Sequence, residues 1–236
     1  PDPAHRLLGG LPPARTFEIL FRTSASGDAA VPAAGTQAIP DQLVAGLGDG
    51  LVRLGCRVGS VDGTTAHLEG GEAVRGRALV VATEGPAAAA LTGVRDPGSK
   101  PVSALWFAVE EPPVRGRSIV LDGTGGGPVA NLAVMSEIAP AYGDGGRSLV
   151  VAACPGTVDA DLESPVRAQV RGWFGPSIDG WELVRHDRIA HGQPLAAVPF
   201  SPKRRISLGD GRYVAGDHRD TPSIQGALFS VSYTHP

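Results

Sequence analysis

The segment from Arg212 to Leu228 carries the residues whose types and spacing best suit ligand chemistry. Its first part, Tyr213 to Ala215, predicts a short apolar strand, and Gly216 follows it at a point where a backbone can approach a ligand closely. Asp217 then stands at the carboxyl end of that strand, the usual place for ligand-binding groups in open α/β sheets. Its carboxylate can accept hydrogen bonds from sugar-like hydroxyl groups.

A helix is predicted to begin just after this loop, at Ser223. Serine is a favoured N-cap residue, and Pro222 before it stiffens the chain that leads into the helix. The first turn, which contains Ile224, Gln225 and Ala227, would present free backbone N–H groups toward whatever the loop encloses. Such groups favour an electron-rich or anionic ligand.

Three segments earlier in the chain have patterns that fit the same kind of site. Residues 35–43 read Gly-Thr-Gln-Ala-Ile-Pro-Asp-Gln-Leu, in which proline and aspartate suit the first turn of a helix. Residues 56–61, Cys-Arg-Val-Gly-Ser-Val, include a predicted strand that contains Val58. Residues 78–83 begin with a continuous apolar run and end at Thr83, which predicts a central strand of a parallel sheet covered on both faces.

Taken in their order along the chain, the four segments resemble the FAD-binding parts of the superfamily of flavin amine oxidases, protoporphyrinogen oxidases and phytoene desaturases. In that family a strand leads to Gly-Asp or Gly-Glu, and a loop then leads to a helix that begins Ser-x-x-Gly-Ala. The resemblance is clearest over residues 35–93 and 180–230, with Thr36 in place of the more usual methionine. It implies that FAD is the cofactor, that Val58 meets the adenine, and that Asp217 meets the ribityl or pyrophosphate part. The implied FAD-binding residues are Val58, Thr83, Gly216, Asp217, Ser223, Ile224, Gln225 and Ala227.

The function that this resemblance implies is an FAD-dependent oxidoreductase, which oxidises a C–N or C–C bond by hydride transfer to the flavin. Its substrate would be a small molecule that is apolar or bears an amine. No catalytic acid or base is assigned, and the loop at residues 218–222 lacks the flavin-facing aromatic residues of amine oxidases. This favours a desaturase-like branch. The residues by themselves leave open an alternative, a non-catalytic α/β binding or interaction module.

Dinucleotide-binding folds open with a strand, the sequence Gly-x-Gly-x-x-Gly and a helix. This chain has no such segment, and its nearest match, residues 123–127, leads through Pro128 into another predicted strand and is therefore predicted to be a loop. We expect a fragment that lacks the first βαβ unit and is inactive by itself. Residues 231–236, Val-Ser-Tyr-Thr-His-Pro, depart from the family pattern and are expected to be a non-native tail.

Composition argues against several other classes of function. The formal net charge is −3, and the 19 arginines and 2 lysines are scattered along the chain, so nucleic-acid binding is not expected. No apolar run is long enough for a transmembrane helix, and a cytoplasmic protein is expected. His186, His191 and His218 lack the spacing of metal ligands. Cys56 and Cys154 are expected to be buried free thiols.

The whole pattern predicts an α/β protein in which a partial Rossmann-like FAD/NAD(P)-binding domain is intertwined with a mixed-sheet α+β substrate domain. Helices are predicted at residues 6–24, 40–47 and 158–174. Strands are predicted at residues 57–61, 65–68, 72–75, 78–82, 103–109, 118–121, 129–135, 148–153, 181–189 and 212–215. The FAD-binding domain would comprise residues 36–93 and 203–230, and the substrate domain residues 94–202 with 1–35 as a helical flank.

Overall fold

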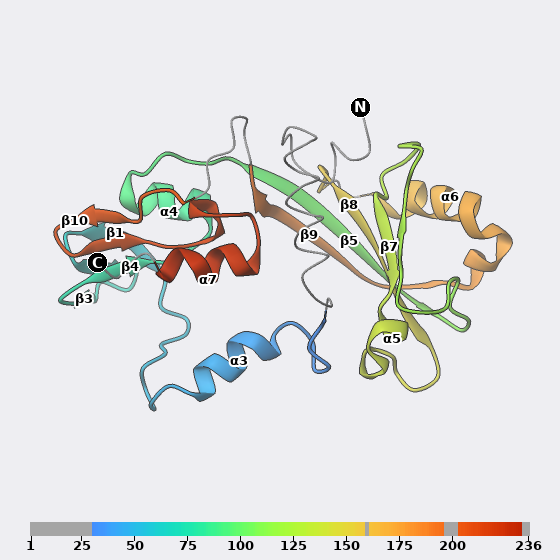
Figure 1. Ribbon diagram of the computed structural model, residues 1–236, viewed down its shortest axis with the longest axis horizontal. Coiled ribbons are helices and arrows are strands. Elements are labelled where there is room, and N and C mark those ends of the chain that lie inside the picture. The colour runs from blue at the N-terminus through green and yellow to red at the C-terminus, as the bar shows by residue number, and fades with distance from the viewer. Residues whose placement is uncertain (1–29, 159–160, 196–202, 233–236) are drawn as a thin grey trace. The chain divides into compact units, whose positions relative to one another are not determined.

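A computed structural model describes residues 30–158, 161–195 and 203–232. The chain divides into two compact units (Figure 1). Unit 1 comprises the described parts of Pro1–Gly48 and Pro101–Ala190, and unit 2 those of Asp49–Lys100 and His191–Pro236. The boundaries predicted from the sequence were residues 36, 94 and 203. The predicted helix at 6–24 and the end of the predicted tail, residues 233–236, lie outside the described residues.

Unit 1 is built on a five-stranded sheet in the order β6-β7-β8-β5-β9. Its strands are β5 (Ser99–Val109), β6 (Ile119–Leu121), β7 (Asn131–Val134), β8 (Ser148–Pro155) and β9 (Glu182–Pro194). The β6–β7, β7–β8 and β5–β8 pairs are antiparallel. All five strands overlap their predicted positions, but β5 begins four residues earlier and β9 ends five residues later than predicted. In β8, alternating burial at Val150, Ala152 and Cys154 leaves a period of two in the sequence.

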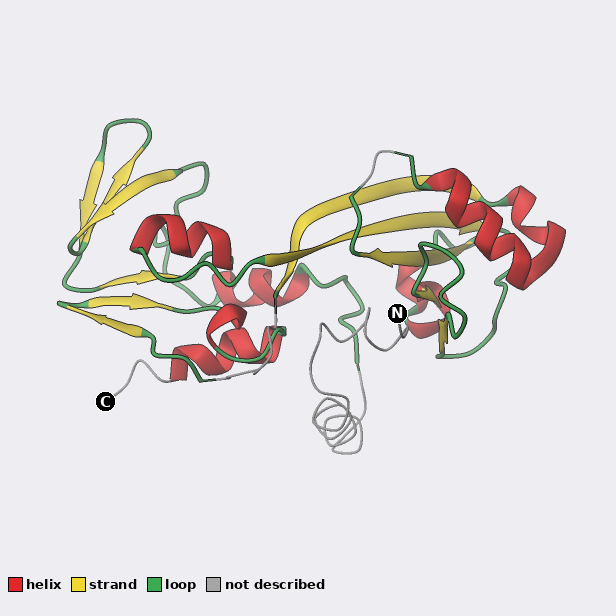
Figure 2. Cartoon of the chain, turned by 90° about the horizontal axis from the view of Figure 1, so that it is seen from above, coloured by secondary structure: helices red, strands yellow, loops and turns green. Residues whose placement is uncertain are grey.

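The core of unit 1 lies between this sheet and helix α6 (Glu163–Phe174) with the 3₁₀ turn η2 (Gly175–Gly180). Val166 and Val170 of α6 are buried in this core, and Figure 2 shows the helix in red beside the yellow strands of the unit. The predicted start of this helix at residue 158 is wrong. Pro165 is compatible with a helix only in its first turn, and the observed start at Glu163 places it there.

Unit 2 contains two small three-stranded sheets. One is an antiparallel meander of β1 (Val58–Asp62), β2 (Thr65–Leu68) and β3 (Ala73–Arg75). The other has the order β10 (Ser207–Gly209), β11 (Arg212–Val214) and β4 (Leu79–Val81), in which β11 and β4 are parallel. Helices α4 (Gly85–Thr92) and α7 (Ile224–Ser232) lie on either side of this second sheet (Figures 1 and 2).

The prediction that residues 78–82 form a central, doubly covered strand is wrong for the described part of the chain. In that part β4 is an edge strand, paired only with β11, and Val80 is 51% exposed. The apolar run arose for a different reason. Leu79 and Val81 face the small core that α4 covers, where Val81, Ala88 and Val214 are buried.

The remaining elements are short. Helix α3 (Ala38–Ala45) begins and ends two residues before the predicted positions, with Gly46 as its C-cap, and none of its residues is buried. Unit 1 also contains α5 (Met135–Ile138) and the 3₁₀ turn η1 (Pro140–Tyr142). The glycine-rich residues 123–127 form a loop between β6 and β7, as predicted.

The two cysteines differ in exposure. Cys154 is buried but Cys56 is exposed, so the prediction for Cys56 is wrong; it lies in a loop before β1 that no helix or sheet covers. Among the described helices, none combines the length and apolar character needed to cross a bilayer. The mixed α/β organisation predicted from the sequence is confirmed.

Candidate functional site

The parallel strands β4 and β11 end side by side in unit 2. Their register pairs Val81 with Val214, and the Ala215 N–H donates to the Val81 carbonyl at 2.9 Å. The residues that follow, Thr83 and Gly216, are therefore neighbours: a Cβ placed on Gly216 would lie 3.5 Å from the Thr83 carbonyl oxygen. The structure thus brings Thr83, Gly216 and Asp217 to one edge, where ligands bind in sheets of this kind.

Gly216 has a backbone that other residues rarely adopt, with φ 148° and ψ 169°. A Cβ there would also lie only 2.6 Å from ring atoms Cε1 and Nδ1 of His218. The Gly216 N–H donates to Ser230 Oγ at 2.8 Å, which ties the end of β11 to helix α7. Glycine is therefore required both by the chain's direction and by the side chain beside it.

Helix α7 begins as the sequence predicts. The Gly226 N–H donates to Ser223 Oγ at 2.9 Å, so Ser223 caps the helix. Ile224 and Gln225 are exposed and Ala227 is partly buried. These four predicted site residues adjoin the loop after β11 through Ser223, but none of them lines the pocket described next.

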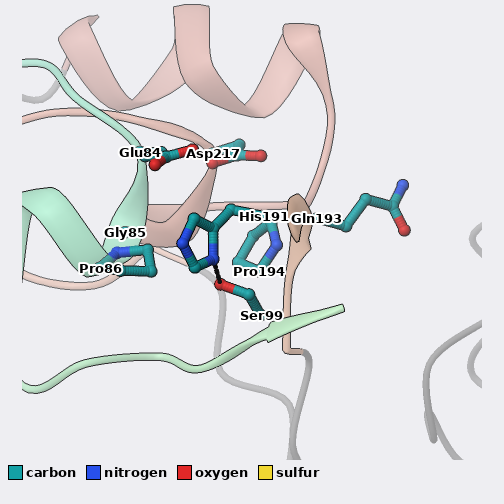
Figure 3. A pocket seen from close by; sticks show the side chains of 8 residues that line it. All are labelled: Glu84, Gly85, Pro86, Ser99, His191, Gln193, Pro194 and Asp217. Carbon is teal, nitrogen blue, oxygen red and sulfur yellow. Dashed lines mark hydrogen bonds between the residues drawn. The ribbon is translucent and has the colours of Figure 1, made fainter. Parts of the chain in front are cut away.

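A small pocket lies at this edge of unit 2 (Figure 3). Its walls come from the turn between β4 and α4, the start of β5, the end of β9 and the 3₁₀ turn η3 (Asp217–Arg219). The lining residues are Glu84, Gly85, Pro86, Ser99, His191, Gln193, Pro194 and Asp217. The pocket encloses about 30 Å³, close to the share of one water molecule, so it accepts one polar group rather than a whole ligand.

The pocket's polar side chains are two carboxylates and three groups that can also donate, Ser99, His191 and Gln193. Glu84 and Asp217 contribute carboxylates, and Figure 3 shows His191 Nδ1 hydrogen-bonded to Ser99 Oγ, 2.9 Å apart. The Asp217 side chain is 32% exposed, and its Oδ1 lies 3.9 Å from His218 Nδ1. A carboxylate with so few partners is free to accept a hydrogen bond from a ligand hydroxyl.

Val58 does not join the other predicted site residues at this edge. It begins β1 and pairs with Leu68 of β2, so it belongs to the meander and not to the sheet that contains β4 and β11. The resemblance also predicts that Val58, Thr83 and Asp217 converge at one sheet edge, and for Val58 this prediction is wrong. The reason is that the hairpin after β1 gives this strand a local antiparallel partner.

Sequence reasoning missed several residues of the site. Ser99, His191 and Gln193 reach it from the start of β5 and the end of β9, and Glu84 follows the predicted site residue Thr83. His218 was interpreted as an ordinary core or surface histidine, yet both of its ring nitrogens are buried without a partner among the described residues. Its position directly after Asp217 was the one signal that could have drawn attention to it. Within the described residues, no cluster of three metal-binding side chains occurs.

Solved structures share this fold. One is a candidate protoporphyrinogen oxidase from Exiguobacterium sp. 255-15, with a TM-score of 0.68 and 13% identity over 86% of this chain and 50% of that one. Another is reduced UDP-galactopyranose mutase, with a TM-score of 0.57 and 14% identity over 78% of this chain and 46% of that one. The chain thus spans about half the length of these structures. Among curated proteins, no significant match was found.

The sequence itself also matches a family model. Residues 12–230 match the model of flavin-containing amine oxidoreductases. This range includes β4, β11 and every residue of the pocket. The chain therefore belongs to the family of flavin-containing amine oxidoreductases.

Proposed function

We propose that the chain is part of an FAD-dependent oxidoreductase and that unit 2 contributes to the FAD site. The observation that carries the proposal is the shared end of β4 and β11, where Thr83, Gly216 and Asp217 meet. In domain terms, residues 36–93 and 203–230 would belong to the FAD-binding domain, and residues 94–202 with 1–35 to the substrate domain. Family membership supports the flavin.

The residues at this edge fit part of the cofactor. Gly216 leaves the backbone open, Asp217 offers a hydrogen-bond acceptor, and the buried ring of His218 has unsatisfied nitrogens beside it. The pocket's volume of about 30 Å³ is far below the roughly 300–1,000 Å³ of a site for a whole small molecule. It therefore suits one hydroxyl of the ribityl chain or a phosphate-linked hydroxyl, with the rest of FAD outside it.

The chain's own part would be to bind and orient. Asp217 would accept a hydrogen bond from a cofactor hydroxyl, and the first turn of α7, with Ser223, Ile224, Gln225 and Ala227, would direct its N–H groups at an electron-rich edge. Val58 would meet the adenine through its backbone. When bound, FAD would accept a hydride from a C–N or C–C bond of an apolar or amine-bearing substrate, and a second acceptor would reoxidise it.

We expect the 236-residue chain to bind FAD reversibly and to be inactive by itself. The glycine-rich turn that holds the pyrophosphate in dinucleotide-binding folds is not in its sequence, so most of the phosphate contacts are missing. A titration should detect binding, whereas extensive dialysis should remove the flavin. Protein that stays yellow after dialysis would contradict this expectation.

Asp217→Ala tests the proposed role directly. A hydrogen bond to a charged group contributes about 1.5–3 kcal/mol, so the Kd for FAD should rise roughly ten- to a hundredfold. The free energy of unfolding of the FAD-free chain should change by less than about 0.5 kcal/mol. Titration calorimetry with FAD and denaturant unfolding measure the two quantities.

Asp210→Asn is the matched control. Asp210 lies at the opposite end of β11 and has φ 51°, a conformation that asparagine tolerates. The substitution removes one negative charge from the same sheet and should leave the Kd for FAD unchanged. An unchanged Kd for Asp217→Ala together with lowered stability would mean that Asp217 only braces its loop.

A further inference from the structure

His218 is the least satisfied buried side chain at the site. Its side chain is 1% exposed, and neither Nδ1 nor Nε2 has a hydrogen-bond partner among the described residues. A buried polar atom without a partner lowers the stability of the folded state. A ring that only filled space here would be better as phenylalanine, which carries no such cost.

Gly216 makes room for this ring, because a Cβ there would lie 2.6 Å from its Cε1 and Nδ1. Gly85 is a neighbour on the other side: a Cβ there would be in ordinary contact with the His218 Cβ, at 3.5 Å. Gly216 follows β11 and Gly85 begins α4, so the ring lies next to the ends of both parallel strands. The local sequence thus accommodates an imidazole closely, although its nitrogens gain nothing from the surrounding protein.

The Asp217 carboxylate lies close to the ring, with His218 Nδ1 3.9 Å from Asp217 Oδ1. This distance is too long for a hydrogen bond. A movement of about 1 Å would create one, and contacts of this kind often tighten only when the ligand is bound. Asp217 also lines the pocket, so a group that fixes its carboxylate also fixes the acceptor presented to a ligand.

We propose that His218 is a positioning residue: its Nδ1–H donates to the Asp217 carboxylate and holds it toward the pocket for a ligand hydroxyl. The proposal deepens the proposed function and rests on it. Asp217 makes the contact with the ligand, and His218 acts only through Asp217. Its burial beneath the loop keeps water from competing for the carboxylate on that side.

The first test is His218→Phe, which keeps a ring of similar shape and removes both nitrogens. The Kd for FAD should rise roughly three- to tenfold, as expected for one lost hydrogen bond, while the stability of the FAD-free chain should stay the same or increase. In an Asp217→Ala background, His218→Phe should leave the Kd unchanged, because the group through which it acts is gone.

Two amide variants make the test specific to one nitrogen. His218→Asn places an N–H donor near the position of Nδ1, and His218→Gln places one near Nε2. We expect His218→Asn to bind FAD within about twofold of the unmodified chain and His218→Gln to match His218→Phe. If His218→Phe does not fold, the difference between the two amide variants decides the question.

The outcomes separate this inference from the proposed function. If Asp217→Ala weakens FAD binding but His218→Phe does not, or weakens it equally with and without Asp217, the positioning role is wrong and the proposed function stands. Equal affinities of the Asn and Gln variants would also overturn it. If the unmodified chain does not bind FAD, or Asp217→Ala has no effect on Kd, both proposals fail.

Discussion

The two units of the chain bury different kinds of side chain. The core of unit 1 is apolar and extensive, with Leu105, Phe107 and Val150 among its fully buried residues. The core cluster of unit 2 is smaller: it is formed by Val81, Ala88 and Val214. Beside that small core, unit 2 buries the polar residues His218, Arg219, Asp220 and Ser230.

The buried polar groups of the two units also differ in how well they are satisfied. In unit 1, Ser103 Oγ donates to the Thr157 carbonyl, and Asp122 accepts from the N–H and hydroxyl of Thr124. Among the described residues, the buried nitrogens without a partner are His186 Nε2 in unit 1 and, in unit 2, Arg212 Nε, Arg219 Nε and both ring nitrogens of His218. Burial lowers the pKa of Arg219. Three of these nitrogens, those of His218 and Arg219, follow the carboxyl end of β11, the edge at which ligands bind in sheets of this kind.

This comparison predicts that unit 1 supplies most of the stability and that unit 2 is the weaker part. All three tryptophans, Trp106, Trp173 and Trp181, belong to unit 1. Tryptophan fluorescence therefore reports the unfolding of unit 1, whereas circular dichroism reports both units. Substitutions in each unit, followed by both signals, therefore test whether the two units differ in stability.

The largest effect is expected for Phe107→Ala in unit 1. Phe107 is 1% exposed, its ring centroid lies 5.7 Å from that of Trp181, and the Arg167 guanidinium lies 5.3 Å above it. The substitution leaves a cavity that should lower the free energy of unfolding by about 3–5 kcal/mol. Denaturant unfolding followed by tryptophan fluorescence measures it. Ile119→Ala, at a position 62% exposed in the same sheet, should cost less than about 0.5 kcal/mol.

A smaller effect is expected for Val214→Ala in unit 2. Val214 is fully buried, but the core around it is small, and the loss should be about 1–3 kcal/mol. The change should appear in circular dichroism and not in tryptophan fluorescence. Val80→Ala, at the neighbouring exposed position of β4, is the control and should be nearly neutral. An equal fall in both signals for Val214→Ala would mean that the units unfold as one, and the comparison would be wrong.

The sequence predicted the strands of both units better than it predicted the site. Strands such as β8 alternate between buried and exposed residues, which leaves a periodic pattern. The cap at Ser223 and the acceptor at Asp217 could be predicted because both depend on neighbours within a few residues. The start of α6 was also predictable from local sequence: Pro165 fits a helix only in its first turn, which places the start near Glu163.

The pocket residues and strand positions that the sequence did not predict depend on contacts between distant residues. His191 and Ser99 are 92 positions apart and form a hydrogen bond only because β5 and β9 are adjacent. The exposed face of Val80 and the separate sheet of Val58 likewise follow from strand order, which local pattern does not determine. His218 was missed for another reason: a histidine's type and position do not reveal whether its nitrogens will find partners.

The smallest effect is expected from the two cysteines, which offer one thiol in each unit. Cys56 of unit 2 is exposed and Cys154 of unit 1 is buried. A thiol reagent should therefore modify Cys56 in the folded chain and Cys154 only after unfolding. Rapid modification of both thiols in the folded chain would contradict the description of unit 1 as a closed apolar core.

Because Cys154 is buried, the free energy of unfolding should depend on pH. Burial raises the pKa of the Cys154 thiol from 9.0 to about 12, because the thiolate is disfavoured in the core. A raised pKa stabilises the folded state fully below pH 9, and this contribution is lost as the pH rises from 9 toward 12. Between pH 8 and 10 the unmodified chain should lose about 1 kcal/mol that Cys154→Ala does not lose. Cys56→Ala should behave as the unmodified chain does, and parallel curves for all three proteins would show that Cys154 ionises equally easily when folded.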